Sequence, residues 1–177
     1  MLEQVLFAGF GGQGMLLAGQ ILAEAGRLEG RYVSWLPSYG PEMRGGTANC
    51  SVCVSDHEIS SPVITSASCV VAMNRPSLDK FESMVRPGGL LIVNSSLIDV
   101  KASRDDIKVV YVEASTIAER EDNPRGANIV VLGAYLQLTG AVDAQSVMDA
   151  MTEKMGEKFA GRNSQVLYAG MDAAKEA

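Results

Sequence analysis

The sequence is poor in cysteine and histidine and has no long apolar run. Its cysteines are Cys50, Cys53 and Cys69, an odd number that would leave one thiol unpaired in a secreted chain. No apolar stretch approaches the roughly 18 residues of a membrane span, and the first residues carry neither a basic region nor a signal-cleavage site. These absences predict a cytoplasmic protein that does not engage a membrane and does not depend on disulfides.

Basic charge is also scarce. The chain has 15 Lys and Arg against 21 Asp and Glu, a formal net charge of −6, and contains no basic run. Because a nucleic-acid-binding protein needs a basic patch, nucleic acid is excluded as a partner. The 177 residues, 47% of them apolar, suffice for a buried core without a metal or disulfide, so we expect a single domain over residues 1–177.

Cys50 and Cys53 have the CxxC spacing of a redox pair or of half a metal site. The residues around them are small or β-branched, which is typical of a strand, and residues three apart in a strand point to opposite faces. A metal site would need two further ligands, and the one histidine, His57, lies in a polar turn. We therefore expect neither a thiol pair nor a metal site.

The order of predicted elements indicates an α/β fold. Strands are expected at residues 4–8, 32–36, 47–54, 68–73, 90–93 and 107–112, and helices at 14–28, 128–138, 143–155 and 163–174. A further helix follows Asn74 with Val85 on its buried face, and Asp143 and Asn163 are expected to cap later helices. The first two strands are expected to form a parallel pair with a right-handed crossover. The predicted fold is an open, mostly parallel, Rossmann-like sheet flanked by helices, with a helical C-terminal part.

A glycine-rich segment, GFGGQG at residues 9–14, lies between the first strand and the first helix. Gly9, Gly11 and Gly14 satisfy G-x-G-x-x-G in its proper setting, where unpaired N–H groups of a helix N-terminus suit a phosphate or another anion. A tight turn that only packs the helix on the sheet remains an equal alternative. No acid occurs at residues 34–38 to hold a ribose, so NAD is disfavoured while NADP stays open, and no Lys-Ser/Thr follows to make a P-loop.

The most distinctive segment is the loop predicted at residues 37–46. If it follows a parallel strand, it lies beside the glycine segment at the carboxyl edge of the sheet, where open α/β sheets bind ligands. Tyr39 can stack or donate a hydrogen bond, Arg44 can bind a phosphate or carboxylate in bidentate fashion, and Gly45-Gly46 can admit a close partner. The alternative is a rigid surface loop in which Arg44 pairs with Glu42 or another acid.

These segments carry a resemblance to a known family. GFGGQG at 9–14, PSYGPEMRGGT at 37–47, Ile59-Ser60-Ser61-Pro62, and the pattern NIVVLG at 128–133 resemble the gamma subunit of the 2-oxoacid:ferredoxin oxidoreductases that act on pyruvate, 2-ketoisovalerate or 2-oxoglutarate. The same module is similar to an internal domain of single-chain pyruvate:ferredoxin oxidoreductases and to part of indolepyruvate oxidoreductase. The resemblance covers essentially the whole chain.

The resemblance implies a subunit of a cytoplasmic hetero-oligomer that oxidises a 2-oxoacid to an acyl-coenzyme A and passes electrons to ferredoxin. It implies alpha and beta partners that hold thiamine diphosphate with Mg²⁺, and [4Fe–4S] clusters on beta or on a ferredoxin-like delta subunit. Three cysteines cannot supply the four thiolates of such a cluster, so this chain is not expected to be catalytic alone. The resemblance associates this subunit with the handling of coenzyme A. Whether the glycine segment binds coenzyme A or only packs stays open, as does the identity of the oxoacid.

The residues expected to bind the cofactor are Gly9, Gly11, Gly12, Gln13, Gly14, Tyr39, Arg44, Gly45 and Gly46. No catalytic residue and no metal ligand is expected. Two other functions remain open: a stand-alone NADP-binding Rossmann oxidoreductase, and a purely structural assembly subunit in which the glycines serve packing.

The role of Arg44 can be tested by titrating coenzyme A into the assembled complex. If Arg44 contacts the ligand, Arg44→Ala lowers the affinity because a charge-assisted hydrogen bond is lost. Unchanged affinity in isothermal titration would remove Arg44 from the binding role. If Arg44 serves the subunit interface instead, the mutant subunit separates from the complex during gel filtration.

Overall fold

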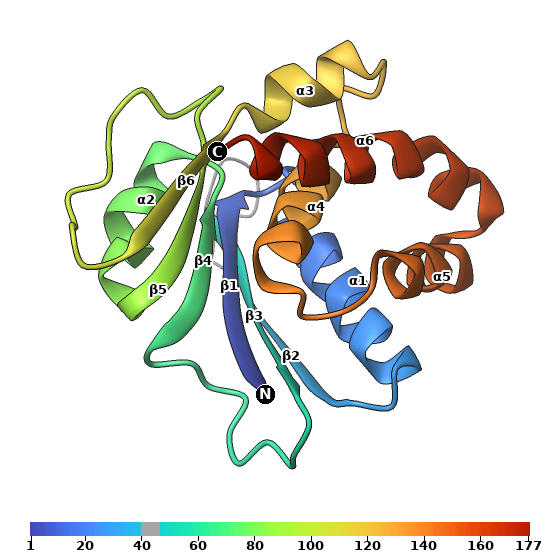
Figure 1. Ribbon diagram of the computed structural model, residues 1–177, viewed down its shortest axis with the longest axis horizontal. Helices are drawn as coiled ribbons and strands as arrows, with labels where there is room; N and C mark the ends of the chain where they lie inside the picture. Colours follow the sequence, from blue (N-terminus) through green and yellow to red (C-terminus); the bar gives the residue numbers. More distant parts are fainter. Residues whose placement is uncertain (40–46) are drawn as a thin grey trace.

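The computed structural model describes residues 1–39 and 47–177, except the side chain of residue 39. These residues contain a six-stranded sheet in the order β2-β3-β1-β4-β5-β6 (Figure 1). The strands are β1 (Leu2–Phe10), β2 (Tyr32–Tyr39), β3 (Thr47–Ser55), β4 (Ala67–Ala72), β5 (Val85–Asn94) and β6 (Lys108–Val112). The helices are α1 (Met15–Leu28), α2 (Arg75–Phe81), α3 (Ala114–Arg120), α4 (Ala127–Thr139), α5 (Ala144–Met155) and α6 (Glu157–Lys175), with a 3-10 turn at Glu82–Met84.

The sheet is mixed. Strands β1, β4, β5 and β6 run parallel to one another, whereas β3 is antiparallel to both β1 and β2. The predicted parallel pair of the first two strands is therefore wrong, because β3 lies between them. Only residues 40–46 connect β2 to β3, and a connection this short joins antiparallel neighbours, whereas a parallel neighbour needs a crossover of about a dozen residues.

Strand β2 is longer than expected. It continues through Pro37 and Ser38 to Tyr39, residues that the sequence assigned to a loop. Since β2 lies at the edge of the sheet, one of its sides has no ladder partner, and an edge strand tolerates a proline that cannot donate a hydrogen bond.

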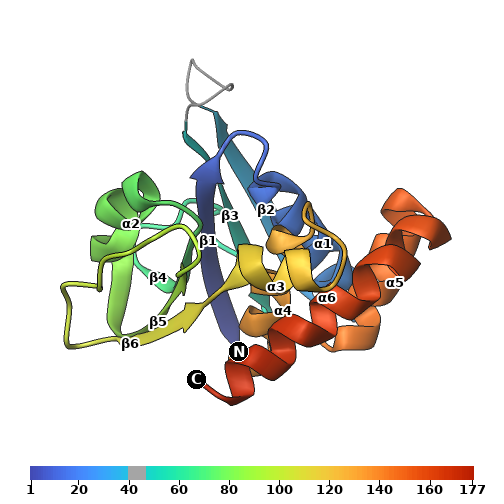
Figure 2. The ribbon, with the colours of Figure 1, turned by 90° about the horizontal axis from the view of Figure 1, so that it is seen from above.

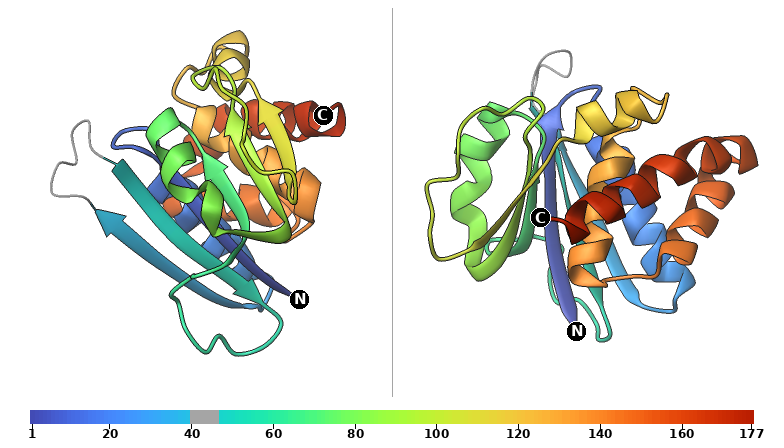
Figure 3. Two further views of the ribbon diagram at one scale, coloured as in Figure 1. Left: turned by 90° about the vertical axis from the view of Figure 1, so that its left-hand side faces the viewer. Right: turned by 45° about the horizontal axis from the view of Figure 1, so that its top comes forward.

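Helices cover both faces of the sheet. Figure 2 and both panels of Figure 3 show α2 on one face and α1, α4, α5 and α6 on the other. The larger core cluster lies under these four helices and includes an edge-to-face contact between Phe7 and Tyr135, with ring centroids 6.1 Å apart. A smaller cluster under α2 joins Leu78 and Phe81 to Leu6 of β1. No described helix combines the length and the apolarity that crossing a membrane would require.

Several helix ends follow local signals and others do not. Asn74 caps α2 as predicted, because its side chain accepts a hydrogen bond from the N–H of Ser77 at 2.9 Å. Val85 is not on this helix but begins β5. Asn163 does not cap a helix: α6 begins at Glu157, and the buried Asn163 amide donates to the carbonyl of Phe159. The short helix α3 was not predicted.

Helices α4 and α6 touch through two glycines. A Cβ on Gly133 of α4 would overlap the carbonyl oxygen of Leu167, and a Cβ on Gly170 of α6 would overlap the carbonyl oxygen of Val130. Both glycines are buried. The two backbones therefore approach more closely than any side chain at these positions would allow.

This contact predicts a strong effect of a single methyl group. Gly170→Ala should lower the free energy of unfolding by about 2 kcal/mol, because α6 must move away from α4 or both must distort. Gly161→Ala in the same helix is the matched control: nothing lies within 4 Å of its added Cβ, so it should raise stability by about 0.5–1 kcal/mol. Urea unfolding of both variants measures the difference, and equal midpoints would contradict the close contact.

The three cysteines are free and buried. Cys50 lies in the core cluster under α1, and Cys53 lies in the cluster on the opposite face. The prediction that these two thiols do not converge is confirmed. Burial raises the pKa of the Cys50 thiol to about 12 and raises the pKa of Cys69 well above its ordinary value.

The burial of all three thiols, together with the raised pKa values of Cys50 and Cys69, predicts cysteines that do not react in the native chain. At pH 8 an exposed cysteine has an appreciable thiolate fraction, but a thiol with a pKa near 12 has almost none. Ellman's reagent should therefore modify no cysteine of the folded chain and all three after denaturation. Rapid labelling of Cys50 in the native protein would show that this face of the sheet opens.

Candidate functional site

The carboxyl ends of β1 and β4 lie next to each other, and the chain that follows each strand runs towards the opposite edge of the sheet. Ala8 and Ala72 are paired in the parallel register, and the N–H of Met73 donates to the carbonyl of Ala8 at 2.9 Å. From here β1 leads through α1 to β2 at one edge, whereas β4 leads through α2 on the other face to β5 (Figure 1). Such a switch point leaves a crevice in which open α/β sheets bind ligands.

The glycine segment borders this crevice with a backbone that requires glycine. Gly12 and Gly14 have φ angles of +92° and +76°, in the left-handed region that favours glycine. A Cβ on Gly14 would also overlap the side chain of Asn128, whose Nδ2 donates to the carbonyl of Gly14 at 3.2 Å. The loop is therefore held from two sides: by its own conformation and by the first turn of α4.

Gln13 closes the turn from within. Its N–H donates to the carbonyl of Phe10 at 3.1 Å, and its side-chain Oε1 accepts from the N–H of Phe10 at 2.6 Å. The same Oε1 accepts from Nδ2 of Asn74 at 3.2 Å. The backbone N–H of Gln13 is thus already satisfied, and the first turn of α1 supplies the unpaired N–H groups, because its first intrahelical bond is Ala18 N–H to Gly14.

Two adjoining cavities open beside this loop. One of about 480 Å³ is lined by Gly12, Gln13, Met73, Ser115, Pro124, Arg125 and Ala127. The other, of about 340 Å³, is lined by Gly12, Gly14, Leu17, Asn123, Arg125, Asn128, Phe159, Arg162 and Asn163. Arg125 and Gly12 line both. Among the described residues that line these two cavities the charged groups are arginines, so this lining suits an anion.

Arg125 and Arg162 carry the positive charge of the site. Within residues 1–39 and 47–177 neither forms a salt bridge, while the arginines that do pair with carboxylates are Arg27, Arg31, Arg75, Arg104 and Arg120. An uncompensated guanidinium beside a helix N-terminus attracts a phosphate or carboxylate. Sequence reasoning missed both residues, although Arg125 stands just before the NIVVLG pattern at 128–133.

Buried amides hold the turn that presents Arg125. Nδ2 of Asn123 donates to Oδ1 of Asn163 at 3.0 Å, which ties this turn to α6. The N–H of Gly126 then donates to the carbonyl of Asn123 at 2.8 Å. Arg125 therefore projects from a turn that is fixed at both of its ends, and Asn163, predicted as a helix cap, serves this purpose instead.

The segment predicted at residues 37–46 is joined to strands β2 and β3, which both meet it at the same edge of the sheet as the glycine loop. Tyr39, the last residue of β2, is paired with Ala48, which is paired with Gly9, and Thr47 is paired with Phe10. Arg44, Gly45 and Gly46 lie outside the described residues, so their proposed contacts remain predictions. The Ile59-Ser60-Ser61-Pro62 segment is not part of this site: its first three residues line a cavity of about 420 Å³ with Met1, Leu2 and His57, next to the amino end of β1.

Comparison with known proteins identifies the family. The pattern of the pyruvate ferredoxin/flavodoxin oxidoreductase family matches residues 4–173. The ketoisovalerate oxidoreductase subunit VorA of Methanothermobacter marburgensis is 39% identical over 177 residues. That match covers 98% of this chain but only 37% of the relative, so the chain spans just over a third of that protein's length.

Solved structures share the fold over nearly the whole chain. The gamma subunit of the keto/oxoacid ferredoxin oxidoreductase from Geobacter sulfurreducens superposes with a TM-score of 0.86 at 30% identity and covers 99% of both chains. The 2-oxoglutarate:ferredoxin oxidoreductase from Magnetococcus marinus, solved with 2-oxoglutarate, coenzyme A and succinyl-CoA bound, has a TM-score of 0.90 at 20% identity. The match covers 99% of this chain and 31% of that one. The chain therefore belongs to the pyruvate ferredoxin/flavodoxin oxidoreductase family.

Proposed function

We propose that this chain is the gamma subunit of a 2-oxoacid:ferredoxin oxidoreductase and that its two adjoining cavities hold the phosphate groups of coenzyme A. The observation that carries the proposal is the pair of uncompensated arginines, Arg125 and Arg162, beside the glycine loop at the switch point of the sheet. Coenzyme A has a pyrophosphate and a separate 3′-phosphate, which suits two neighbouring cationic cavities. The Magnetococcus relative was solved with this same molecule bound.

The chain would position the acyl acceptor while its partners perform the chemistry. No histidine or carboxylate is among the described residues that line its cavities, and its cysteines are free and buried. Thiamine diphosphate with Mg²⁺ belongs on alpha and beta partners, and the [4Fe–4S] clusters that pass electrons to ferredoxin belong on beta or a ferredoxin-like delta subunit. Free, buried thiols suit the reducing cytoplasm in which such a complex would work.

The alternative of a stand-alone NADP-dependent enzyme has little support in the geometry. In a dinucleotide-binding fold the second strand lies beside the first, and its end contacts the ribose. Here β3 separates β2 from β1, and residues 34–38 at the end of β2 contain no acid. A purely structural assembly subunit would bind no coenzyme A, so ligand binding separates it from our proposal.

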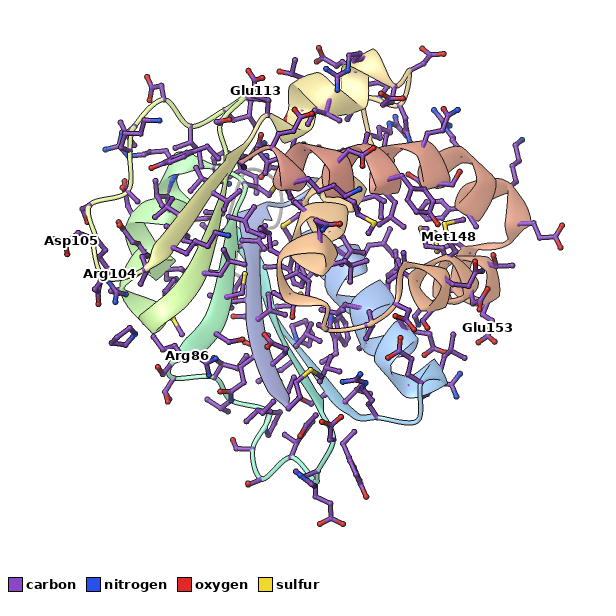
Figure 4. The ribbon with its side chains drawn as sticks, viewed as in Figure 1. Arg86, Arg104, Asp105, Glu113, Met148 and Glu153 are labelled. Atoms are coloured by element: carbon purple, nitrogen blue, oxygen red, sulfur yellow. The ribbon has the colours of Figure 1, made fainter. Side chains whose placement is uncertain are left out.

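The test is calorimetric titration of coenzyme A into the assembled complex. Arg125→Met should weaken binding by about tenfold to a hundredfold, because charge-assisted hydrogen bonds to phosphate are lost. Pantetheine, which has no phosphate, should show no change. Arg86→Met is the matched control: Arg86 also lacks a salt bridge among the described residues, but it lies near the amino end of β5 (Figure 4).

Two results would contradict the proposal. One is a wild-type complex that binds no coenzyme A. The other is an equal loss of affinity in the Arg125 and Arg86 variants, which would indicate a general effect of surface charge.

A further inference from the structure

We infer that the side chain of Gln13 is a direct ligand contact, whose Nε2 amide group donates a hydrogen bond to a phosphate oxygen of coenzyme A, and that Asn74 orients it. This inference rests on the proposed function, since it concerns the same cavity. The backbone N–H of Gln13 cannot contact the ligand, because it already donates to the carbonyl of Phe10. The inference therefore assigns the ligand contact to the side chain of Gln13.

The orientation of the Asn74 side chain is fixed by the first turn of α2. The N–H of Ser77 is a donor only, so the atom of the Asn74 carboxamide that it meets at 2.9 Å must be the oxygen, Oδ1. The other end of that carboxamide is therefore Nδ2, which can only donate. A backbone group thus determines which way Asn74 presents its amide.

Asn74 passes this orientation on to Gln13. Its Nδ2 lies 3.2 Å from the end of the Gln13 side chain, and the N–H of Phe10, a second donor, lies 2.6 Å from the same atom. Only an oxygen can accept both bonds, so this atom is Oε1. Two independent donors therefore leave Nε2 as the outer end of the Gln13 carboxamide.

The outer atom of the Gln13 carboxamide, Nε2, is free to contact a ligand in the cavity. Gln13 is half-buried and lines the 480 Å³ cavity together with Arg125, and Nε2 has no hydrogen-bond partner among the described residues. An NH₂ group with two unused N–H bonds can only donate, so its partner must be a hydrogen-bond acceptor. Beside an arginine and the first turn of α1, that partner is an anionic oxygen rather than a cation or an amide donor.

Gln13→Glu separates this role from a structural one. A carboxylate can still accept from the N–H of Phe10 and from Asn74, so the turn should keep its shape and the thermal unfolding midpoint should not change. Its second oxygen would replace the amide donor with a negative charge. At pH 8, where this carboxylate is ionised, the complex should bind coenzyme A about tenfold to a hundredfold more weakly, while pantetheine affinity should match that of the wild type.

Asn74→Asp tests the orienting role. The new carboxylate can still cap α2 by accepting from Ser77, but it cannot donate to Oε1 of Gln13. Oε1 of Gln13 then faces a carboxylate oxygen while the N–H of Phe10 still requires an acceptor. No orientation of the Gln13 amide satisfies both neighbours, so Nε2 loses its fixed direction towards the cavity. We expect a loss of coenzyme A affinity of about tenfold, again with pantetheine binding retained and the unfolding midpoint unchanged.

Each outcome has a defined meaning. Wild-type affinity for coenzyme A in Gln13→Glu would overturn the inference, and wild-type affinity in Asn74→Asp would overturn the orienting role. If Arg125→Met weakens binding while Gln13→Glu does not, the proposed function stands and only the Gln13 contact fails. If the wild-type complex binds no coenzyme A, the proposed function itself fails.

Discussion

The close contact between α4 and α6 determines the geometry of the candidate site. Because Gly133 and Gly170 let the two backbones touch, the first turn of α4 brings Asn128 to the glycine loop, and α6 brings Asn163 to the turn that carries Arg125. The cavities are thus bounded on one side by the β1–α1 connection and on the other by this helix pair. A shift of α6 would move one wall relative to the other, so the packing of α6 against α4 controls the dimensions of the cavities.

The charged residues of the molecule are distributed unevenly. The chain is acidic overall, with a net charge of −6, and most arginines are neutralised by nearby carboxylates. Arg125 and Arg162 are exceptions within the described part, and both line the same cavity. Two free guanidinium groups therefore line one cavity of a chain that is acidic overall, so their attraction for an anion acts at the same place.

Local sequence signals predicted the parts of this site that depend on neighbouring residues. The glycine segment, the start of α1 and the Asn74 cap each rely on contacts within a few positions. The insertion of β3, the Asn123–Asn163 pair and the bond from Asn128 to Gly14 depend on residues far apart in the chain, 114 positions in the last case. A side-chain amide gives no sign in the sequence of the backbone carbonyl it will meet, so these features required the folded structure.

The edge strand β2 has a further consequence for how the chain behaves outside a complex. From Tyr32 to Tyr39 it contains no charged residue, whereas exposed edges are commonly guarded by lysine against pairing with other molecules. Pro37 interrupts this edge with a position that has no N–H. A foreign strand aligned on β2 would therefore meet a missing donor at Pro37 rather than electrostatic repulsion from a lysine.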